Sequence, residues 1–138
     1  MLCTCATQQG TEYKKIDKYL RTHFKQYDPK ANNCVFLLSE YGCIPCVKEF
    51  AELIKDYRNK PNTYIIICAS GTFVDISPFI KDTALTNVYD DSQFVFRKDI
   101  YYFPSAIFLK DNKIDTIVDI AALKLDSIFT FIKQKADI

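Results

Sequence analysis

Near one third of its length, the chain reads Cys34-Val35-Phe36-Leu37-Leu38-Ser39-Glu40-Tyr41-Gly42-Cys43-Ile44-Pro45-Cys46. The first five residues form a continuous apolar run, as expected of a strand buried on both faces. Residues 39–42 break this run, and an amphipathic helix begins beside the two cysteines and continues to about Asn59. A second apolar run, Tyr64 to Ala69, predicts another buried strand. A strand, a helix and a strand of these lengths predict a parallel pair joined by a right-handed crossover.

Further elements on both sides of this unit complete an α/β pattern. Apolar residues at three- and four-residue steps predict a helix from Glu12 to Tyr27. Downstream, the sequence allows short helices at 75–82 and 92–99, and it predicts a strand at 105–109, a hairpin turn, an antiparallel strand at 114–120 and a closing helix with the stripe Leu125, Ile128, Phe129 and Ile132. We therefore expect a central mixed sheet with helices on both faces.

The bulk properties indicate one ordinary globular domain. The chain has 138 residues, of which 49% are apolar and 25% charged, and its net charge is +1. Charges of both signs are interspersed, so no basic stripe indicates a nucleic acid partner. The longest apolar run is too short to span a bilayer. We expect residues 1–11 to form a flexible tail and residues 12–138 to form a single domain.

The first residues, Met1-Leu2-Cys3-Thr4-Cys5-Ala6, allow two interpretations. They resemble the end of a bacterial lipoprotein signal, with Leu2 three residues before Cys5, although Thr4 is unusual before a lipidated cysteine. This interpretation predicts an extracytoplasmic, periplasmic protein whose contact with the membrane is an N-terminal lipid anchor. The alternative is the flexible end of a cytoplasmic protein.

The six cysteines are spaced as one close pair and four others, namely Cys43 and Cys46, then Cys3, Cys5, Cys34 and Cys68. Two intervening residues let the sulfurs of a CxxC pair reach bonding distance within one helical turn. At a helix N-terminus, the free N–H groups and the helix dipole favour a thiolate and lower the pKa of the first cysteine. We expect Cys43 to attack and Cys46 to resolve the mixed disulfide. Pro45 suits the first turn and stiffens the loop between the sulfurs.

This strand, Cys-x-Pro-Cys and helix resemble the thioredoxin active site, and a second match is Tyr102-Phe103-Pro104-Ser105-Ala106-Ile107-Phe108-Leu109, followed by the hairpin. In that family a cis proline precedes this strand and faces the active-site sulfurs. Pro104 matches the proline, and Phe103 matches the residue before it, whose backbone contacts substrate. The sequence from Tyr89 to Ile114 is similar to that of the extracytoplasmic branch of TlpA-type and AhpC-TSA proteins. The resemblance implies a protein-disulfide oxidoreductase that has protein thiol or disulfide substrates, a reductant partner and no cofactor.

Departures from the family pattern affect the expected chemistry. Tyr41 and Gly42 stand where the family has a tryptophan next to the first cysteine, and Tyr41 is expected to supply the aromatic surface. The bulky Ile44 replaces a small residue between the cysteines. We expect Tyr41, Ile44, Pro45, Phe103 and Pro104 to contact substrate. No histidine lies between the cysteines, which favours reduction of substrates over oxidation.

The handling of the Cys46 proton is a further departure. Leu37 occupies the position of the buried acid that serves thioredoxin, and Glu40 and Glu49 are candidate substitutes. A non-catalytic peptide-binding module with a vestigial disulfide is therefore the alternative function.

Other interpretations are less favoured by the residues. A zinc site needs four ligands, and only Cys3 and Cys5 could join the pair, so we expect no metal. Peroxidase chemistry in this fold needs a Thr or Ser three residues before the cysteine, where Glu40 precedes Cys43. Cys34 and Cys68 lie in apolar runs and are staggered apart, which predicts two free core thiols. His23, on the polar side of its helix, is expected to be solvated.

Overall fold

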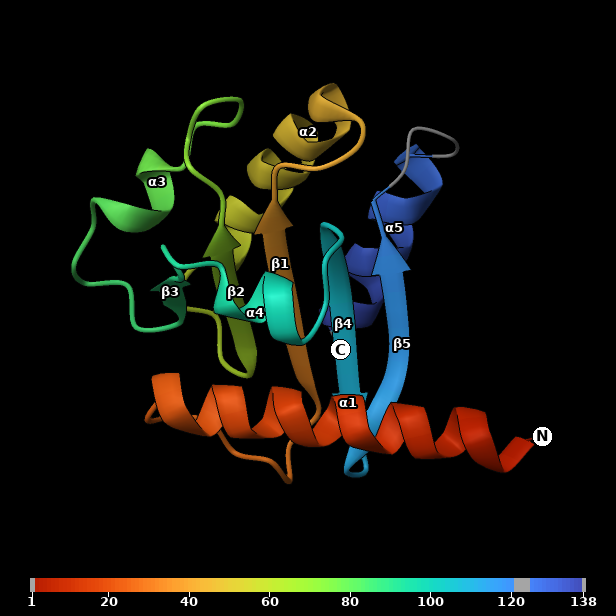
Figure 1. The fold of residues 1–138 in the computed structure, drawn as a ribbon. Helices are drawn as coiled ribbons and strands as arrows, with labels where there is room; N and C mark the ends of the chain where they lie inside the picture. Colours follow the sequence, from red (N-terminus) through yellow and green to blue (C-terminus); the bar gives the residue numbers. More distant parts are fainter. Residues whose placement is uncertain (1, 121–124, 138) are drawn as a thin grey trace.

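A central sheet of five strands organises the protein, whose computed structural model describes residues 2–120 and 125–137, with side chains from residue 10 onward (Figure 1). Across the sheet the strands follow the order β3-β2-β1-β4-β5. They are β1 (Asn33–Ser39), β2 (Thr63–Cys68), β3 (Val88–Asp90), β4 (Ser105–Lys110) and β5 (Lys113–Asp119). Strands β1, β2 and β3 are parallel, whereas β4 runs antiparallel to both β1 and β5. The expected mixed sheet is therefore confirmed.

The middle strand, β1, is buried along its whole length, and so is β2 beside it. In the register, Leu37 of β1 lies opposite Ile66 of β2 on one side and Ser105 of β4 on the other. Continuous apolar runs are stable only when both faces of the strand are covered. The two predicted buried strands and their parallel pairing are thus confirmed.

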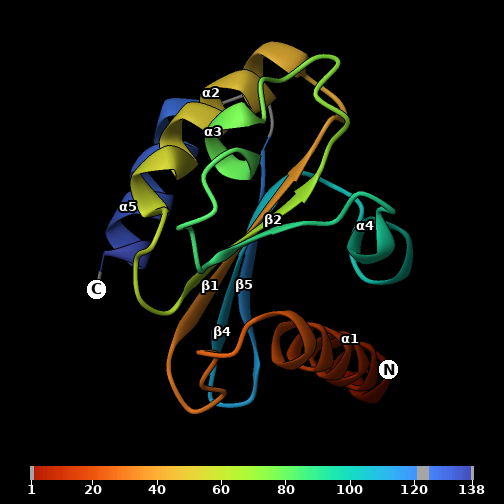
Figure 2. The same ribbon diagram turned by 90° about the vertical axis from the view of Figure 1, so that its left-hand side faces the viewer.

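Helices cover both faces of the sheet (Figure 2). They are α1 (Leu2–His23), α2 (Ile44–Ile54), α3 (Ser77–Ile80), α4 (Val95–Asp99) and α5 (Leu125–Ala136), and a 3-10 turn, η1 (Lys55–Tyr57), follows α2. Phe36 and Leu38 of β1 belong to the core shared with α2, α3 and α5. Val35 and Leu37 point to the other face and belong to the core shared with α1 and α4. The period-two alternation of a strand thus supplies both cores.

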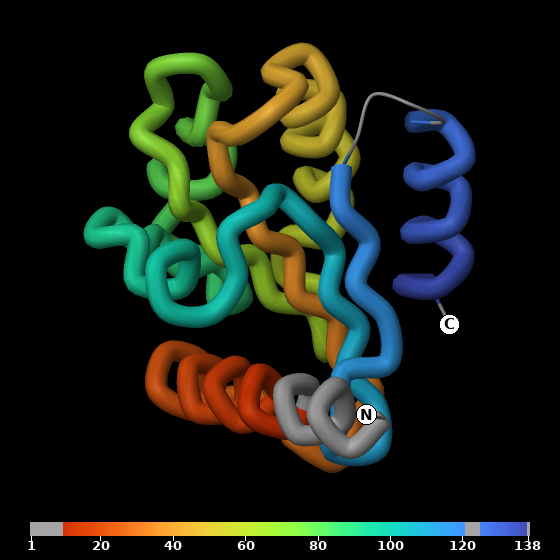
Figure 3. The backbone as a smooth tube through the Cα atoms, turned by 45° about the vertical axis from the view of Figure 1, so that its right-hand side comes forward, coloured from red at the N-terminus to blue at the C-terminus, as the bar shows by residue number. Residues whose placement is uncertain are grey.

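The hairpin of β4 and β5 is also confirmed. Its turn residues Asp111 and Asn112 have φ angles of 54° and 59°, as a two-residue hairpin turn requires. The hydroxyl of Tyr13 in α1 donates a hydrogen bond to the side chain of Asn112 at 3.4 Å, which agrees with the place of α1 beside this turn (Figure 3).

The first helix differs at both ends from the predicted range, Glu12 to Tyr27. It begins at Leu2 and therefore crosses the expected boundary at residue 12. It ends at His23, and Tyr27 beyond it donates a hydrogen bond to Asp17 at 2.6 Å. The mobility expected of residues 1–11 stays a prediction, since the side chains of residues 1–9 lie outside the described part.

The edge strand β3 was not expected from the sequence. It follows Asn87, which is buried and donates hydrogen bonds to the carbonyls of Tyr57 at 2.9 Å and Thr63 at 2.8 Å. The side-chain oxygen of Asn87 accepts from the backbone N–H of Asn59 at 2.7 Å. These contacts attach the start of β3 to the chain around β2, which explains why so short a strand is aligned there.

Candidate functional site

The two cysteines of the CxxC motif form a disulfide at the start of α2. Cys43 is the N-cap residue of α2, and its Sγ accepts a hydrogen bond from the backbone N–H of Cys46 at 3.3 Å. Pro45 lies in the first turn, where a missing N–H costs no helical hydrogen bond. The first cysteine therefore occupies the position where a helix offers unsatisfied N–H groups.

The two sulfurs differ in their access to solvent. Cys43 is half-buried, whereas Cys46 is 5% exposed and belongs to the core that α2 shares with the sheet. A substrate can therefore reach Cys43 more readily than Cys46. This asymmetry agrees with the expected roles of an attacking and a resolving sulfur.

The turn from β1 into α2 depends on Gly42, which has a φ of +78°. A Cβ at this position would meet no atom within 4 Å, so the restriction there is one of backbone conformation and not of space. Glycine adopts positive φ at little cost, unlike residues with a side chain. Gly42 thus allows the sharp turn that brings Cys43 to the helix start, in a backbone conformation that a tryptophan at this position would strain.

A small hollow of about 310 Å³ opens beside the disulfide. It is lined by Tyr41, Gly42, Cys43, Phe103, Pro104, Asp119 and Ile120. The antiparallel pairing of β4 with β1 brings residues 103–104 next to Cys43, and the Ser39 hydroxyl donates to the Tyr102 carbonyl at 3.1 Å. The structure thus gathers three of the five expected substrate contacts, Tyr41, Phe103 and Pro104, around Cys43. Ile44 and Pro45 lie in the first turn of α2 and do not line the hollow.

The prediction of a cis peptide bond before Pro104 is wrong, because that bond is trans in the structure. The trans form is the more stable one for X-Pro bonds by about 0.5–1 kcal/mol, and sequence alone does not set the isomer. Pro104 is held in place through its carbonyl, which accepts from the Ile120 N–H at 3.0 Å. It is trans but not remote, since it lines the same hollow as Cys43.

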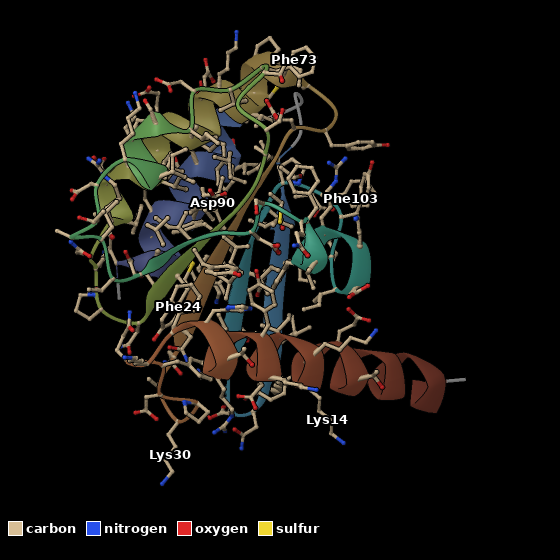
Figure 4. The ribbon with its side chains drawn as sticks, turned by 60° about the vertical axis from the view of Figure 1, so that its left-hand side comes forward. Lys14, Phe24, Lys30, Phe73, Asp90 and Phe103 are labelled. Atoms are coloured by element: carbon tan, nitrogen blue, oxygen red, sulfur yellow. A yellow bond between two sulfur atoms is a disulfide. The ribbon has the colours of Figure 1, made fainter. Side chains whose placement is uncertain are left out.

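Two exposed aromatic rings, Tyr41 and Phe103, line the hollow and pack against Tyr102, and we call these three residues the aromatic wall. The ring centroids of Tyr41 lie 4.8 Å from Tyr102 and 5.2 Å from Phe103, in edge-to-face arrangements. Each of the three side chains is more than 40% exposed. Figure 4 shows Phe73, on the loop after β2, beside the start of α2, and Phe103 lower in the view, near α4. The predicted aromatic surface supplied by Tyr41 is therefore present.

Glu40 does not face the sulfurs as a free acid. Its carboxylate accepts hydrogen bonds from the backbone N–H groups of Ser70 at 2.8 Å, Phe73 at 2.7 Å and Val74 at 3.0 Å. Burial alone would raise the pKa of Glu40, but these hydrogen bonds outweigh it and hold the pKa below its ordinary value. Glu40 thus anchors the loop after β2 as an ionised group. Glu49, the other candidate proton acceptor, is exposed on α2.

A buried carboxylate that the sequence analysis missed is Asp91, which is 3% exposed. It accepts from the Tyr19 hydroxyl at 2.8 Å, the Phe96 N–H at 2.8 Å and the Val95 N–H at 3.1 Å. Burial acts to raise its pKa, but these donors outweigh it and the pKa lies below the ordinary range. Its partners lie on the α1 and α4 side of the sheet, opposite the core that contains Cys46. An aspartate shortly before a short helix is a capping signal that could have revealed it.

The two single cysteines are free and buried, as expected. In the parallel register Cys34 lies opposite Thr63 and Cys68 opposite Ser39, so the two thiols are staggered apart. Burial raises the pKa of both, and burial together with the nearby Asp91 carboxylate raises that of Cys68 to about 12. Both are poor nucleophiles at neutral pH.

His23 differs from the expectation of a solvated histidine. Its ring stacks on Tyr89 with centroids 3.9 Å apart, and it is half-buried. Burial lowers the pKa of His23, and this effect outweighs the nearby Asp91 carboxylate, which acts to raise it. The ring is held by an aromatic contact that the helical pattern alone does not reveal.

Within residues 2–120 and 125–137, no three His, Cys, Asp or Glu side chains are grouped closely enough to hold a metal ion. In the same part of the chain, no helix combines the length and the apolar character needed to cross a membrane. The zinc and lipoprotein interpretations depend on Cys3 and Cys5, whose side chains lie outside the described residues.

Comparisons with protein-family models, with curated proteins and with solved structures each find no match to this chain. What the protein does therefore has to be inferred from the chemistry of the site.

Proposed function

We propose that the protein is a thioredoxin-like thiol–disulfide oxidoreductase that exchanges disulfides with protein substrates and works as a reductant. The observation that carries this proposal is the position of Cys43. Its sulfur caps α2, is bonded to Cys46 and opens onto a hollow walled by aromatic rings. This combination supports the proposal, because the sulfur that we assign as nucleophile, its bonded partner and an aromatic surface suited to a substrate chain lie together.

The topology supports the finer assignment of the fold. The strand before the CxxC motif lies between a parallel and an antiparallel neighbour, and a hairpin completes that side of the sheet. A proline precedes β4 and lines the hollow beside the first cysteine. The trans peptide bond before that proline is a departure from the family.

The proposed reaction moves two electrons from the protein to its substrate. In the reduced protein, the Cys43 thiolate attacks one sulfur of a substrate disulfide, so that a Cys43–substrate disulfide forms and the substrate S–S bond breaks. The leaving substrate sulfur takes up a proton and becomes a thiol. Cys46, as a thiolate, then attacks the Cys43 sulfur and releases the second substrate thiolate, which is protonated in turn. The protein ends with the Cys43–Cys46 disulfide. An external dithiol must then reduce this disulfide to regenerate the two thiols.

The start of α2 favours the thiolate that this reaction needs. A negative charge in the N-cap position is stabilised by the N–H groups of the first turn and by the helix dipole. Cys43 already accepts one such hydrogen bond from Cys46 N–H. The motif contains no histidine that would stabilise the Cys43 thiolate further. The lack of this extra stabilisation supports reduction of substrates over their oxidation.

Reduction of insulin disulfides in the presence of dithiothreitol tests the proposal. The wild-type protein should accelerate the precipitation of insulin chains, Cys43→Ser should abolish the acceleration, and Cys46→Ala should accumulate a mixed disulfide with insulin. Cys34→Ala, which removes a buried thiol at the opposite end of β1 from the motif, is the matched control and should retain the activity. Equal rates with wild type and Cys43→Ser would refute the proposal.

A binding module with a vestigial disulfide is the second candidate. The hydrogen bonds of Glu40 favour this candidate. Its carboxylate holds the loop after β2 and is therefore not available to accept the Cys46 proton. Alkylation of the reduced protein by iodoacetamide across pH distinguishes the two. An apparent pKa of Cys43 at or above the ordinary value of about 8.5 would favour the binding module.

We also propose an extracytoplasmic location with a lipid anchor at Cys5 or Cys3. The support is the likeness of residues 1–6 to the end of a lipoprotein signal. Labelling of the native full-length protein with a fatty acid analogue tests this, and loss of the label in Cys5→Ala, with Cys3→Ala as its counterpart, identifies the acceptor. A native protein that carries no label would contradict it.

A further inference from the structure

A carboxylate lines the hollow beside the disulfide. Of the described residues that line it, Asp119 is the one with a charged side chain. It shares the hollow with Cys43, so a group bound near this carboxylate lies next to the reactive sulfur. The remaining lining consists of two aromatic rings, a glycine, a proline and an isoleucine.

The position of Asp119 is set by the sheet. It is the last residue of β5 and pairs with Ser105, at the start of β4. The Tyr101 hydroxyl donates a hydrogen bond to its Oδ1 at 2.6 Å, and Ile120 N–H donates to the Pro104 carbonyl at 3.0 Å. In the described part of the chain, Asp119 Oδ2 has no hydrogen-bond or ion-pair partner. One carboxylate oxygen is thus held in place by Tyr101, and the other has no partner among these residues.

The aromatic wall favours the same kind of ligand as the carboxylate. Aromatic faces attract cations, and this cluster already holds one, since the Arg97 guanidinium lies 4.2 Å from the Tyr102 ring centroid. Tyr41 and Phe103 line the hollow itself and have no cation from the described residues over their rings. A volume of about 310 Å³ is at the lower limit of ligand pockets, so it suits a single side chain.

We propose that the hollow selects disulfide substrates with a lysine or arginine next to the attacked cysteine, and that Asp119 is the specificity-determining residue. This inference rests on the proposed oxidoreductase function and names its substrate class. The basic side chain lies against the rings of Tyr41 and Phe103 and pairs with the Asp119 carboxylate. An acidic neighbour is disfavoured, because it brings a second negative charge to the same place.

The test uses three oxidised peptides that are identical except for Lys, Gln or Glu next to one cysteine of their disulfide. Reduced wild-type protein, freed of reductant, is mixed with each peptide, and acid quenching followed by mass spectrometry gives the second-order rate constant. The lysine peptide should react about two- to fivefold faster than the glutamine peptide, as expected for an exposed charge pair, and the glutamate peptide should react slowest. High salt should shrink these ratios.

Asp119→Asn should bring the three rate constants together, and Asp119→Lys should reverse their order. Asp115→Asn is the matched control, because it removes the same charge from the same strand away from the hollow, and it should preserve the wild-type order. Equal rates for the three peptides with wild type would overturn the inference while leaving the oxidoreductase proposal intact. Equal slowing of all three by Asp119→Asn would overturn it too, since that result indicates a role in proton transfer. Failure to reduce any peptide would overturn both.

Discussion

The carboxylate of Glu40 accepts a hydrogen bond from the backbone N–H of Phe73 at 2.7 Å, which joins the segment before the disulfide to the loop after β2. The same oxygen accepts from Val74, and the other carboxylate oxygen accepts from the backbone and the hydroxyl of Ser70. One side chain thus organises the loop that carries the exposed Phe73.

Replacement of Glu40 by glutamine should release this loop. The amide offers one acceptor oxygen in place of two and presents an NH2 group to backbone N–H donors, at a cost of about 1–3 kcal/mol. Exchange of the Phe73 and Val74 amides should accelerate roughly tenfold or more, as hydrogen-exchange mass spectrometry or NMR can measure. Glu49→Gln is the control and should leave both amides unchanged. Unaltered exchange in Glu40→Gln would show that the loop is held by other contacts.

The contribution of Glu40 should also depend on pH with a definite sign. The pKa of Glu40 is lowered in the folded protein, so its ionised form stabilises the fold at any pH above its unfolded value of about 4.3. This stabilisation is lost as the pH falls through the lower, folded pKa. The difference in unfolding free energy between wild type and Glu40→Gln should be constant from pH 7 to about 5 and shrink below pH 4. A difference that grows on acidification would contradict the assignment.

The sequence predicts the centre of this fold well and its edges less well. The runs that become β1 and β2 can be stable only if both faces are covered, and the turn at Asp111 and Asn112 favours the hairpin. β3 has no such local signal, since its three residues are aligned through the contacts of Asn87 with distant carbonyls. The apolar stripe predicts a start for the first helix that is later than its actual start at Leu2.

For the candidate site, the sequence predicts which residues meet but not how each is used. The CxxC spacing and Pro104 lead to the hollow beside Cys43. The family resemblance predicts the wrong isomer for the bond before Pro104, because an intrinsic preference of about 0.5–1 kcal/mol is small enough for the surroundings to decide the isomer. Glu40 and Asp119 acquire their roles from loop and strand partners far along the chain, which a single sequence does not reveal.

Asp91→Asn should destabilise the protein without affecting the disulfide chemistry. Its carboxylate is buried and accepts from Tyr19, Val95 and Phe96, so the amide leaves donors unpaired at a cost of about 2 kcal/mol. Urea unfolding should show this loss, while Asp90→Asn, an exposed neighbour, should change stability by less than about 0.5 kcal/mol. Loss of insulin reduction in a folded Asp91→Asn protein would show that Asp91 acts on the sulfurs, contrary to its place on the other face of the sheet.

The cysteines should differ widely in their rates of alkylation. In a Cys3→Ser, Cys5→Ser background, reduced protein at pH 8 should take up iodoacetamide first at Cys43, as peptide mass spectrometry can show. A thiol with a pKa of about 12, such as Cys68, is ionised at that pH in about one molecule in ten thousand. Cys34 and Cys68 should react only when urea unfolds the protein. Early labelling of either one in the native state would show that its part of the core opens.

Gly42→Ala should weaken the turn that presents Cys43. A residue with a Cβ at a φ of +78° costs about 1–2 kcal/mol, and because no atom lies within 4 Å of that Cβ, the whole loss comes from the backbone. Gly42→Asn should lose less, since asparagine tolerates this region. Gly10→Ala, inside α1 and equally free of contacts, should instead stabilise by about 1 kcal/mol. Urea unfolding of the three variants should show a lower unfolding free energy for the Gly42 variants and a higher one for Gly10→Ala. Changes of the same sign at both glycines would mean that φ is not what restricts position 42.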